Sequence, residues 1–167
     1  MDVIRQATSQ SDMDEVRTLF REYEEWLGFD LCFQNFEEEL RTLPGKYAPP
    51  DGRLLIAEAD GNLAGTIALR RFADDTGEIK RLYVRPGYRG HRFGDRLIGS
   101  LIAEARSIGY RKLVLDTHPA KMGKAGTLYR SHGFRAIKPY YTNPIDGVIY
   151  MALELSGEDP ETTADPN

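Results

Sequence analysis

The sequence has little of what marks secreted, membrane-spanning or metal-holding proteins. Its 167 residues include a single cysteine, Cys32, so neither an intrachain disulfide nor a site with several cysteine ligands can form. No apolar run approaches the roughly 18 residues that a membrane span needs, and Met1–Arg5 lacks the apolar stretch of a signal peptide. The three histidines, His91, His118 and His132, share no metal-ligand spacing. We therefore expect a cytoplasmic protein that needs no metal and no membrane.

The residues that are present make an ordinary globular mixture, of which 41% are hydrophobic and 29% charged. The length predicts one domain over residues 1–155, followed by an acidic disordered tail, residues 156–167, that has no basic or aromatic residue. Charge is segregated along the domain: residues 1–51 hold 12 acidic and 5 basic residues, whereas residues 80–138 hold 14 basic and 3 acidic ones. Such a basic block is either a solvated face or the seat of a polyanionic ligand.

Hydrophobic periodicity places helices and strands along the whole of this domain. Spacings of three and four between apolar residues predict helices over residues 13–27, 33–43, 93–108 and 122–132. Extended apolar runs bounded by turn residues predict strands over residues 3–7, 53–58, 63–70, 78–84, 112–116, 134–136 and 148–154. This order of elements predicts an α+β fold with a mixed, mostly antiparallel sheet flanked by helices.

The segment from Leu82 to Leu97, LYVRPGYRGHRFGDRL, is the most informative part of the sequence. A strand ends at Val84, and a glycine-bearing loop opens directly onto the long helix. The first N–H groups of a helix lack intrahelical partners, and Gly90 and Gly94 remove side chains that would hold an anion away. Four arginines surround the same turn: Arg85, Arg89, Arg92 and Arg96. The segment is either a phosphate seat or a strand–helix connection that tolerates glycine and exposes its arginines.

Within this segment the sequence resembles the GCN5-related N-acetyltransferase (GNAT) family. Residues 89–94, RGHRFG, occupy the family's acetyl-CoA signature Gln/Arg-x-x-Gly-x-Gly/Ala, and the preceding KRLYVRP is also typical of the family. A second match follows downstream in the right order, at residues 113–116, Ala125, Leu128, Tyr129, Gly133 and Phe134. The resemblance spans residues 4–155, nearly the whole predicted domain.

Two positions depart from the residues that are usual in the family. Arg92 stands where the family usually has a glycine, and a positive φ there would cost an arginine about 1–2 kcal/mol. We therefore expect an ordinary backbone conformation at Arg92, with its N–H group still directed at the pyrophosphate. Met122 stands where many members carry an asparagine that helps to hold the cofactor. A methionine side chain cannot make the polar contact that this asparagine makes.

The resemblance implies transfer of an acetyl group from acetyl-CoA to a primary amine of a small molecule or peptide, directly within a ternary complex, with CoA as the product. It implies that the fourth and fifth strands splay apart, so that the backbone of Leu82 and Val84 can pair with the pantetheine arm. The loop of residues 89–94 would take the pyrophosphate, mainly through its N–H groups. The residues expected to bind the cofactor are Leu82, Tyr83, Val84, Arg89, Gly90, His91, Arg92, Phe93, Gly94, Asp95, Met122, Ala125, Leu128 and Tyr129.

Acetyl transfer needs a base for the amine and an acid for the departing thiolate. Tyr129 stands where the family places its thiolate acid, and a phenol keeps its proton at neutral pH; the alternative is an aromatic residue that only packs. Glu78, at the head of EIKRLYV, is the first candidate base, acting through water, although a solvated glutamate at a strand end is an alternative. His118, after the fifth strand, is the second candidate base.

Substrate recognition in this family comes from the first two helices and from the loop of residues 137–147, called the late loop below. Here these segments and the end of the fifth strand offer Tyr23, Trp26, Phe29, Asp30, His118, Tyr140 and Tyr141. The acidic first third of the chain would attract a cationic amine, and the aromatic residues would contact its apolar part. The alternative for the two adjacent tyrosines is a loop held in place by aromatic packing.

A second class of function stays open at this point, namely a non-catalytic acyl-CoA-binding domain that senses the cofactor or binds a protein partner. The presence of Tyr129 and Glu78 at motif-compatible positions favours the enzyme. No nucleic-acid recognition motif accompanies the basic block, so no nucleic-acid partner is expected. The sequence fits either a monomer or a homodimer.

Overall fold

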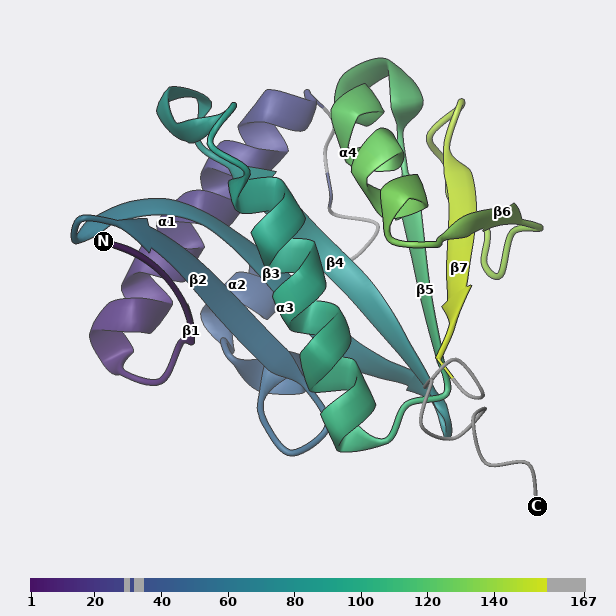
Figure 1. Cartoon of the computed structure of the whole chain (residues 1–167), viewed down its shortest axis with the longest axis horizontal. Coiled ribbons are helices and arrows are strands. Elements are labelled where there is room, and N and C mark those ends of the chain that lie inside the picture. Colours follow the sequence, from purple (N-terminus) through teal and green to yellow (C-terminus); the bar gives the residue numbers. More distant parts are fainter. Residues whose placement is uncertain (29–30, 32–34, 156–167) are drawn as a thin grey trace.

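The computed structural model describes residues 1–28, 31 and 35–155, and a seven-stranded sheet runs through its centre (Figure 1). The strands are β1 (Asp2–Gln6), β2 (Arg53–Ala59), β3 (Asn62–Ala73), β4 (Thr76–Val84), β5 (Lys112–Thr117), β6 (Arg135–Ile137) and β7 (Ile149–Glu154). They lie in the order β1-β2-β3-β4-β5-β7-β6, and every neighbouring pair is antiparallel except β4 and β5. The mixed, mostly antiparallel sheet is therefore confirmed. The expected tail, residues 156–167, lies outside the described residues.

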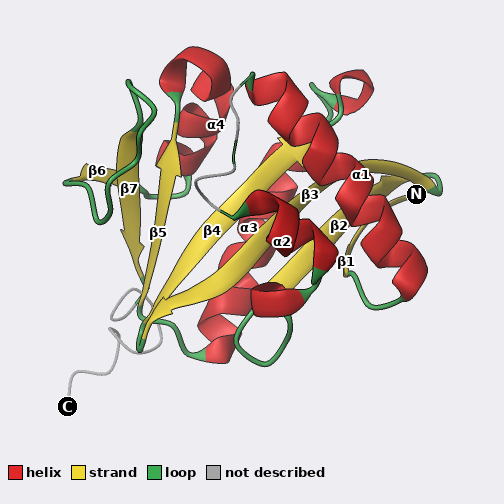
Figure 2. Cartoon of the chain, turned by 180° about the vertical axis from the view of Figure 1, so that it is seen from behind, coloured by secondary structure: helices red, strands yellow, loops and turns green. Residues whose placement is uncertain are grey.

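Helices cover both faces of this sheet. They are α1 (Gln10–Leu27), α2 (Phe36–Arg41), α3 (Phe93–Ile108) and α4 (Pro119–Ser131). In Figures 1 and 2, α3 lies on one face of the sheet, α1 and α2 lie on the opposite face, and α4 lies beside β5. Two hydrophobic clusters correspond to the two faces: Leu97 and Leu101 belong to the cluster under α3, and Phe20 and Phe36 to the cluster under α1 and α2.

The regular apolar spacing of α3 buries one face of the helix against the sheet. Leu97, Ile98 and Leu101 have no exposed surface, and complete burial of such a side chain stabilises a fold by about 1.5–3 kcal/mol. The helix ends at Ile108, one residue before Gly109, as the sequence predicts. This packing fixes the position of the helix start, which faces the cleft described below.

The later elements differ from the prediction mainly in their ends. The helix predicted over residues 122–132 begins at Pro119, because proline is well suited to the first turn of a helix, where its missing N–H group has no partner to lose. A non-helical backbone at Met122 (φ −124°, ψ 34°) then interrupts the apolar period. The strand predicted over residues 134–136 lies one residue later, at 135–137. Of the helix predicted over residues 33–43, residues 36–41 are helical, and residues 33 and 34 lie outside the described residues.

The parallel strands β4 and β5 pair over only a short distance. Thr76–Glu78 of β4 pairs with Lys112–Val114 of β5, after which β4 runs on to Val84 and β5 to Thr117. Figure 1 shows the two strands separating toward α4. The splayed strands that the sequence resemblance implies are confirmed, and the gap between them positions the site.

A bulge in β4 shapes the wall of this gap. Thr66 pairs with Tyr83 and Ala68 with Lys80, so two residues of β4 lie opposite one residue of β3. The bulge contains Arg81 at φ +62°, a conformation that is unfavourable for a residue with a side chain. The ion pair of the buried Arg81 with Glu39, at 2.8 Å, holds the side chain in place. As a result Lys80 and Arg81, although adjacent in sequence, line the same cavity.

Candidate active site

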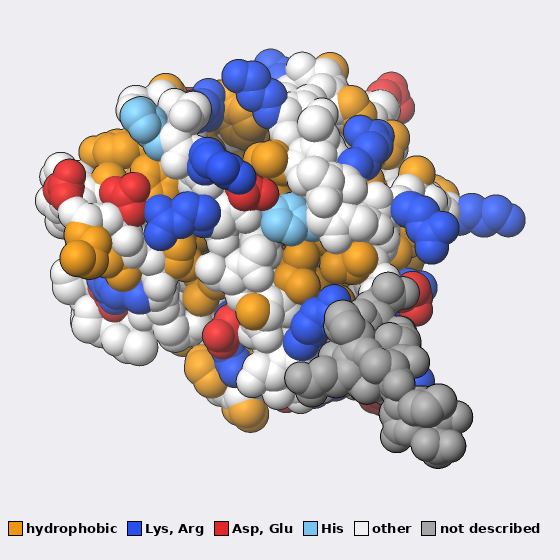
Figure 3. Space-filling view, in the orientation of Figure 1, with side chains coloured by type: hydrophobic (Ala, Val, Ile, Leu, Met, Phe, Trp, Pro, Cys, Tyr) orange, Lys and Arg blue, Asp and Glu red, His pale blue; other side chains and the backbone are white. Residues whose placement is uncertain are grey.

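A long cleft of about 1010 Å³ lies between β4, the start of α3 and the start of α4. Its walls carry the basic residues Arg89, Arg92, Lys121 and Lys124. Asp95, the one acidic residue among the described residues of its lining, accepts hydrogen bonds from His132 at 2.8 Å and from Arg92 at 3.3 Å. Figure 3 shows basic side chains around a hollow on this face of the molecule. The cleft therefore suits an elongated ligand that carries negative charge.

The loop that opens onto α3 makes two left-handed turns. Gly90 has φ +87°, and Arg92, the residue that precedes the helix, has φ +66°. The expectation of an ordinary backbone at Arg92 is wrong, because the chain reverses direction between the short helix Pro86–Tyr88 and α3 within a few residues. The side chain of Arg92 does not cap α3, so the first N–H groups of the helix stay available to an anion.

The two glycines of the signature serve different purposes. Gly90 supplies a positive φ, and a Cβ atom there would meet nothing within 4 Å. Gly94 instead allows close packing, since a Cβ atom would lie 3.0 Å from Cδ1 of Leu128 on α4. A side chain at position 94 would therefore press on α4 and enter the cleft that both residues line.

Arg89 lies folded along the wall of the cleft. Its guanidinium group stacks over the ring of Trp26 at 4.9 Å and near the ring of Tyr83 at 5.9 Å. Its Nε donates a hydrogen bond of 2.9 Å to the carbonyl oxygen of Val84. Trp26, which we expected beside the substrate, thus lines the same cleft as the signature loop. The sequence alone does not predict that Trp26 lines the cleft, because only the packing of α1 against β4 brings its ring beside the signature loop.

A narrow waist of about 50 Å³ continues the cleft toward the opposite face of the sheet. Leu82 and Met122 line both the cleft and the waist. Tyr129 lies in the waist and is only 3% exposed, and burial raises the pKa of its phenol well above the ordinary range. A phenol in this environment keeps its proton and can act as a donor.

Other titratable side chains meet Tyr129 in the waist. Tyr23 lines it, and burial raises the pKa of Tyr23 to about 12. His118, which precedes α4, donates from Nε2 to the carbonyl oxygen of Asp146 at 2.9 Å. A carbonyl oxygen only accepts, so Nε2 is the donor in this contact. This hydrogen bond holds the His118 ring in the lining of the waist.

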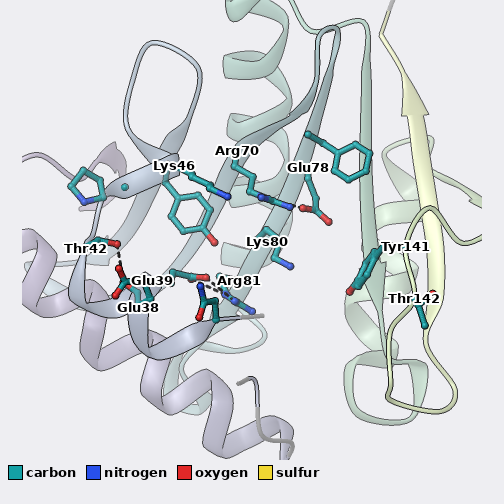
Figure 4. Close-up of a pocket in the computed structure, with 15 residues that line it drawn as sticks. Glu38, Glu39, Thr42, Lys46, Arg70, Glu78, Lys80, Arg81, Tyr141 and Thr142 are labelled. Carbon is teal, nitrogen blue, oxygen red and sulfur yellow. Dashed lines mark hydrogen bonds and ion pairs between the residues drawn. The ribbon is translucent and has the colours of Figure 1, made fainter. Parts of the chain in front are cut away.

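A third cavity, of about 400 Å³, opens on the far side of the waist and is called the acceptor cavity below (Figure 4). Lys80 and Arg81 line both the waist and the acceptor cavity. Glu78 lies in its wall and is only 2% exposed. Glu78 accepts hydrogen bonds from Arg70 Nε at 2.8 Å and from the Tyr140 hydroxyl at 2.6 Å. The alternative of a solvated glutamate at a strand end is therefore wrong.

The late loop is held by its two tyrosines. Tyr141 donates a short hydrogen bond to Asp116, and Asn143 also donates to Asp116, at 3.2 Å. The rings of Tyr140 and Tyr141 both pack against Tyr150 of β7, with centroids 5.3 Å and 5.6 Å away. Burial raises the pKa of both tyrosines, and neighbouring carboxylates raise it further. Aromatic packing thus fixes this loop, while Tyr141 still lines the acceptor cavity.

Within residues 1–28, 31 and 35–155, no group of three or more His, Cys, Asp or Glu side chains is arranged to hold a metal ion. In the same part of the chain, every helix is too short or too polar to cross a membrane. Phe29 and Asp30, which we expected to contact substrate, lie outside the described residues.

Comparison with known proteins identifies the family. Residues 13–134 match the sequence model of the acetyltransferase (GNAT) family. The chain belongs to the GNAT family. An uncharacterized N-acetyltransferase of Schizosaccharomyces pombe is 42% identical over 147 residues, which cover 87% of this chain and 90% of that protein. The resemblance stated from the sequence is therefore confirmed.

Solved structures of GNAT proteins share the fold. A GNAT acetyltransferase from Staphylococcus aureus Mu50 superposes with a TM-score of 0.77 at 22% identity, covering 93% of this chain and 99% of that one. The PaiA N-acetyltransferase of Thermoplasma acidophilum, solved in complex with coenzyme A, gives a TM-score of 0.71 at 21% identity, covering 92% and 99%. These likenesses confirm the expected GNAT architecture.

The GNAT fold gathers most of the residues that we expected to bind the cofactor. Every one of them except His91 and Tyr129 lines the long cleft, and Tyr129 lies in the adjoining waist. Sequence reasoning missed the first turn of α4, which contributes Pro119, Ala120 and Lys121 to the cleft. A proline directly after His118 is a helix-start signal that could have revealed this turn.

Proposed function

We propose that the protein is an acetyl-CoA-dependent N-acetyltransferase that acetylates a primary amine directly, with both substrates bound at once. The observation that carries the proposal is that the three cavities adjoin one another through shared lining residues. Leu82 and Met122 join the cleft to the waist, and Lys80 and Arg81 join the waist to the acceptor cavity. A donor bound in the cleft and an acceptor bound in the acceptor cavity would therefore approach each other at the waist.

The residues of the long cleft fit the chemistry of CoA. The unpartnered N–H groups at the start of α3 and the basic side chains Arg92, Lys121 and Lys124 suit its phosphates. The splayed part of β4, including Leu82 and Val84, leaves backbone groups beside the cleft for an extended amide-bearing arm. When bound, acetyl-CoA supplies an acetyl group activated as a thioester.

Tyr129 is the proposed acid of the reaction. Its Oη holds a proton at the waist, and burial opposes loss of that proton. No described residue forms a hydrogen bond with the phenol of Tyr129, so its hydroxyl can donate to the thiolate sulfur of the departing CoA. Because donation to a thiolate neutralises the leaving group, it lowers the barrier where charge develops.

We propose that Glu78 binds the amine of the acceptor, and Glu78 is also the first candidate for the base that removes a proton from this amine. Each carboxylate oxygen keeps a lone pair after accepting from Arg70 and Tyr140, so Glu78 can also accept from an ammonium group or a water. His118 is the second candidate, since its ring lines the waist and is held there by the carbonyl oxygen of Asp146. Replacement of each by glutamine, followed by the pH dependence of turnover, separates the two.

The test of the proposed function is turnover of acetyl-CoA against a panel of amines, measured as thiol release. The expected result is amine-dependent release, with one acetylated product per thiol. Tight CoA binding without release on any amine would instead favour the non-catalytic sensor. Tyr110→Phe is a matched control variant, because its hydroxyl bonds the carbonyl of Asp51 and lines none of the three cavities described.

A further inference from the structure

Among the described residues that line the acceptor cavity, more side chains are basic than acidic. Its charged lining residues are Glu38, Glu39, Glu78, Lys46, Arg70, Lys80 and Arg81. Each of the three carboxylates already has an arginine partner: Arg41 for Glu38, Arg81 for Glu39 and Arg70 for Glu78. An amine alone would add further positive charge to this cavity. A ligand that also carries a negative group would match the cavity better.

Among the cations that line the acceptor cavity, Lys46 is the one for which the described part of the chain offers no partner. It belongs to the short helix Gly45–Tyr47, its side chain is exposed, and it makes no hydrogen bond or ion pair with a described residue. Figure 4 shows its amino group directed toward Arg70. Lys46 is thus positioned to meet an anionic group of a ligand at the entrance of the cavity.

Arg70 connects this cation to the proposed seat of the amine. Its Nε donates to Glu78, whereas neither of its Nη groups bonds with a described residue. The guanidinium is planar and offers donors on two edges, so it can hold Glu78 on one edge and a carboxylate on the other. An ammonium on Glu78 and a carboxylate on Arg70 would then lie within the width of one side chain, as they do in an amino acid.

We propose that the acceptor cavity binds a free amino acid, with its ammonium on Glu78 and its carboxylate between the Nη groups of Arg70 and the Nζ of Lys46. The volume of about 400 Å³ is within the range of small-molecule sites and leaves room for a side chain. A peptide with the same N-terminal residue lacks the free carboxylate at this distance. This substrate class rests on the proposed acetyltransferase function.

The test compares amino acids with their carboxamides. Both members of a pair have the same amine and almost the same size, but the carboxamide has no negative charge. The amine of the carboxamide is also the less basic of the two, so a preference for the acid cannot come from easier deprotonation. We expect the acids to be used with kcat/KM about 10-fold or more above that of the carboxamides.

Lys46→Gln gives the second arm of the experiment. It should raise KM for the amino acid by about 3- to 10-fold and leave KM for the carboxamide unchanged, as expected for one charge-assisted contact at an exposed site. Lys138→Gln is the matched control, since Lys138 is exposed and lines none of the three cavities described. The control should leave both KM values unchanged.

The outcomes separate this proposal from the function on which it rests. Turnover of carboxamides at least as fast as acids, or equal effects of Lys46→Gln on both, would overturn the amino acid site and leave the acetyltransferase intact. If no amine is turned over, calorimetry of the CoA-bound protein decides: amino acid binding weakened by Lys46→Gln alone supports the site, and no binding of the acids overturns it.

Discussion

The Tyr140 hydroxyl donates a hydrogen bond of 2.6 Å to Oε2 of Glu78, a residue 62 positions earlier in the chain. Glu78 is also the last residue of β4 that pairs with β5. The bond therefore ties the late loop to the point where the two strands begin to separate. It gives a nearly buried carboxylate a second donor, beside Arg70.

Tyr140→Phe should destabilise the protein and slow its turnover. Removal of the hydroxyl leaves one oxygen of a buried carboxylate without its donor, and such a bond to a charged group is worth about 1.5–3 kcal/mol. Urea denaturation measures the change in the free energy of unfolding. Tyr110→Phe, which removes a bond to a neutral carbonyl, should cost only about 0.5–1.5 kcal/mol and leave turnover unchanged. Equal stability of Tyr140→Phe and the unaltered protein would mean that water replaces the hydroxyl.

Tyr129→Phe should separate the acid role of Tyr129 from its packing role. The ring also packs against Phe134, with centroids 5.3 Å apart, and phenylalanine preserves that contact. We expect turnover to fall by about 10²–10⁴-fold while CoA affinity and melting temperature stay nearly constant. Retention of more than about a third of the rate, with chemistry rate-limiting, would show that another group protonates the thiolate.

Because burial raises the pKa of Tyr129, its ionisation should not limit the reaction at moderately alkaline pH. The rate of the unaltered enzyme should therefore show no decline assignable to Tyr129 up to about pH 10, the ordinary pKa of a phenol. Stopped-flow measurement of thiol release over that range gives the profile. A decline that is present in the unaltered enzyme and missing in Tyr129→Phe would contradict the raised pKa.

Gly94→Glu should abolish the stabilisation of the protein by CoA. CoA at about 100 times its dissociation constant should stabilise the fold by about 2.7 kcal/mol. The new carboxylate would enter the cleft beside the N–H groups of α3 and press on Leu128. Gly87→Glu adds the same charge at a position with open space outside the cleft, and it should keep the stabilisation. Melting curves with and without CoA compare the two, and a full response of Gly94→Glu would refute the phosphate seat.

The stability of the fold should depend on Asp12 in acid. Arg5 donates two hydrogen bonds to Asp12, and the N–H groups of Thr8 and Ser9 donate two more, which together hold the pKa of this carboxyl well below its usual range. A lowered pKa in the folded state gives stability that is complete above the unfolded pKa of about 3.9 and is lost as the pH falls below it. Asp12→Asn should therefore be less stable than the unaltered protein at pH 7.

The difference between Asp12→Asn and the unaltered protein should shrink below about pH 4. Urea denaturation at neutral and at acid pH measures it. A difference that stays constant across this range would show that Asp12 stabilises the fold through its shape and neutral hydrogen bonds instead.

Local patterns predicted the framework of the site well. The apolar period of α3 and the glycine-bearing loop before it place the start of the helix correctly, because both signals lie within one short segment. The sequence resemblance added the separation of β4 and β5. Features that depend on contacts between distant parts of the chain were harder to predict from the sequence. Arg92 takes a positive φ because two elements fixed elsewhere require a sharp turn between them.

The burial of Glu78 shows the same limit. Its partners are Arg70 on the neighbouring strand and Tyr140 in the late loop, and no local pattern indicates either contact. Trp26 gives a similar lesson, since it stacks on Arg89 only after α1 has packed against β4. Pairings of this kind depend on tertiary packing, which a single sequence does not display.

The short contact between β4 and β5 divides the sheet into a four-stranded and a three-stranded part, joined through Thr76–Glu78 and Lys112–Val114. Strand edges elsewhere in proteins are templates for unwanted association with other chains. Here the facing edges border the cleft and the waist, which would admit an extended ligand between them. Such a ligand would act as a removable strand, and its arrival would slow amide hydrogen exchange on both sides of the gap together.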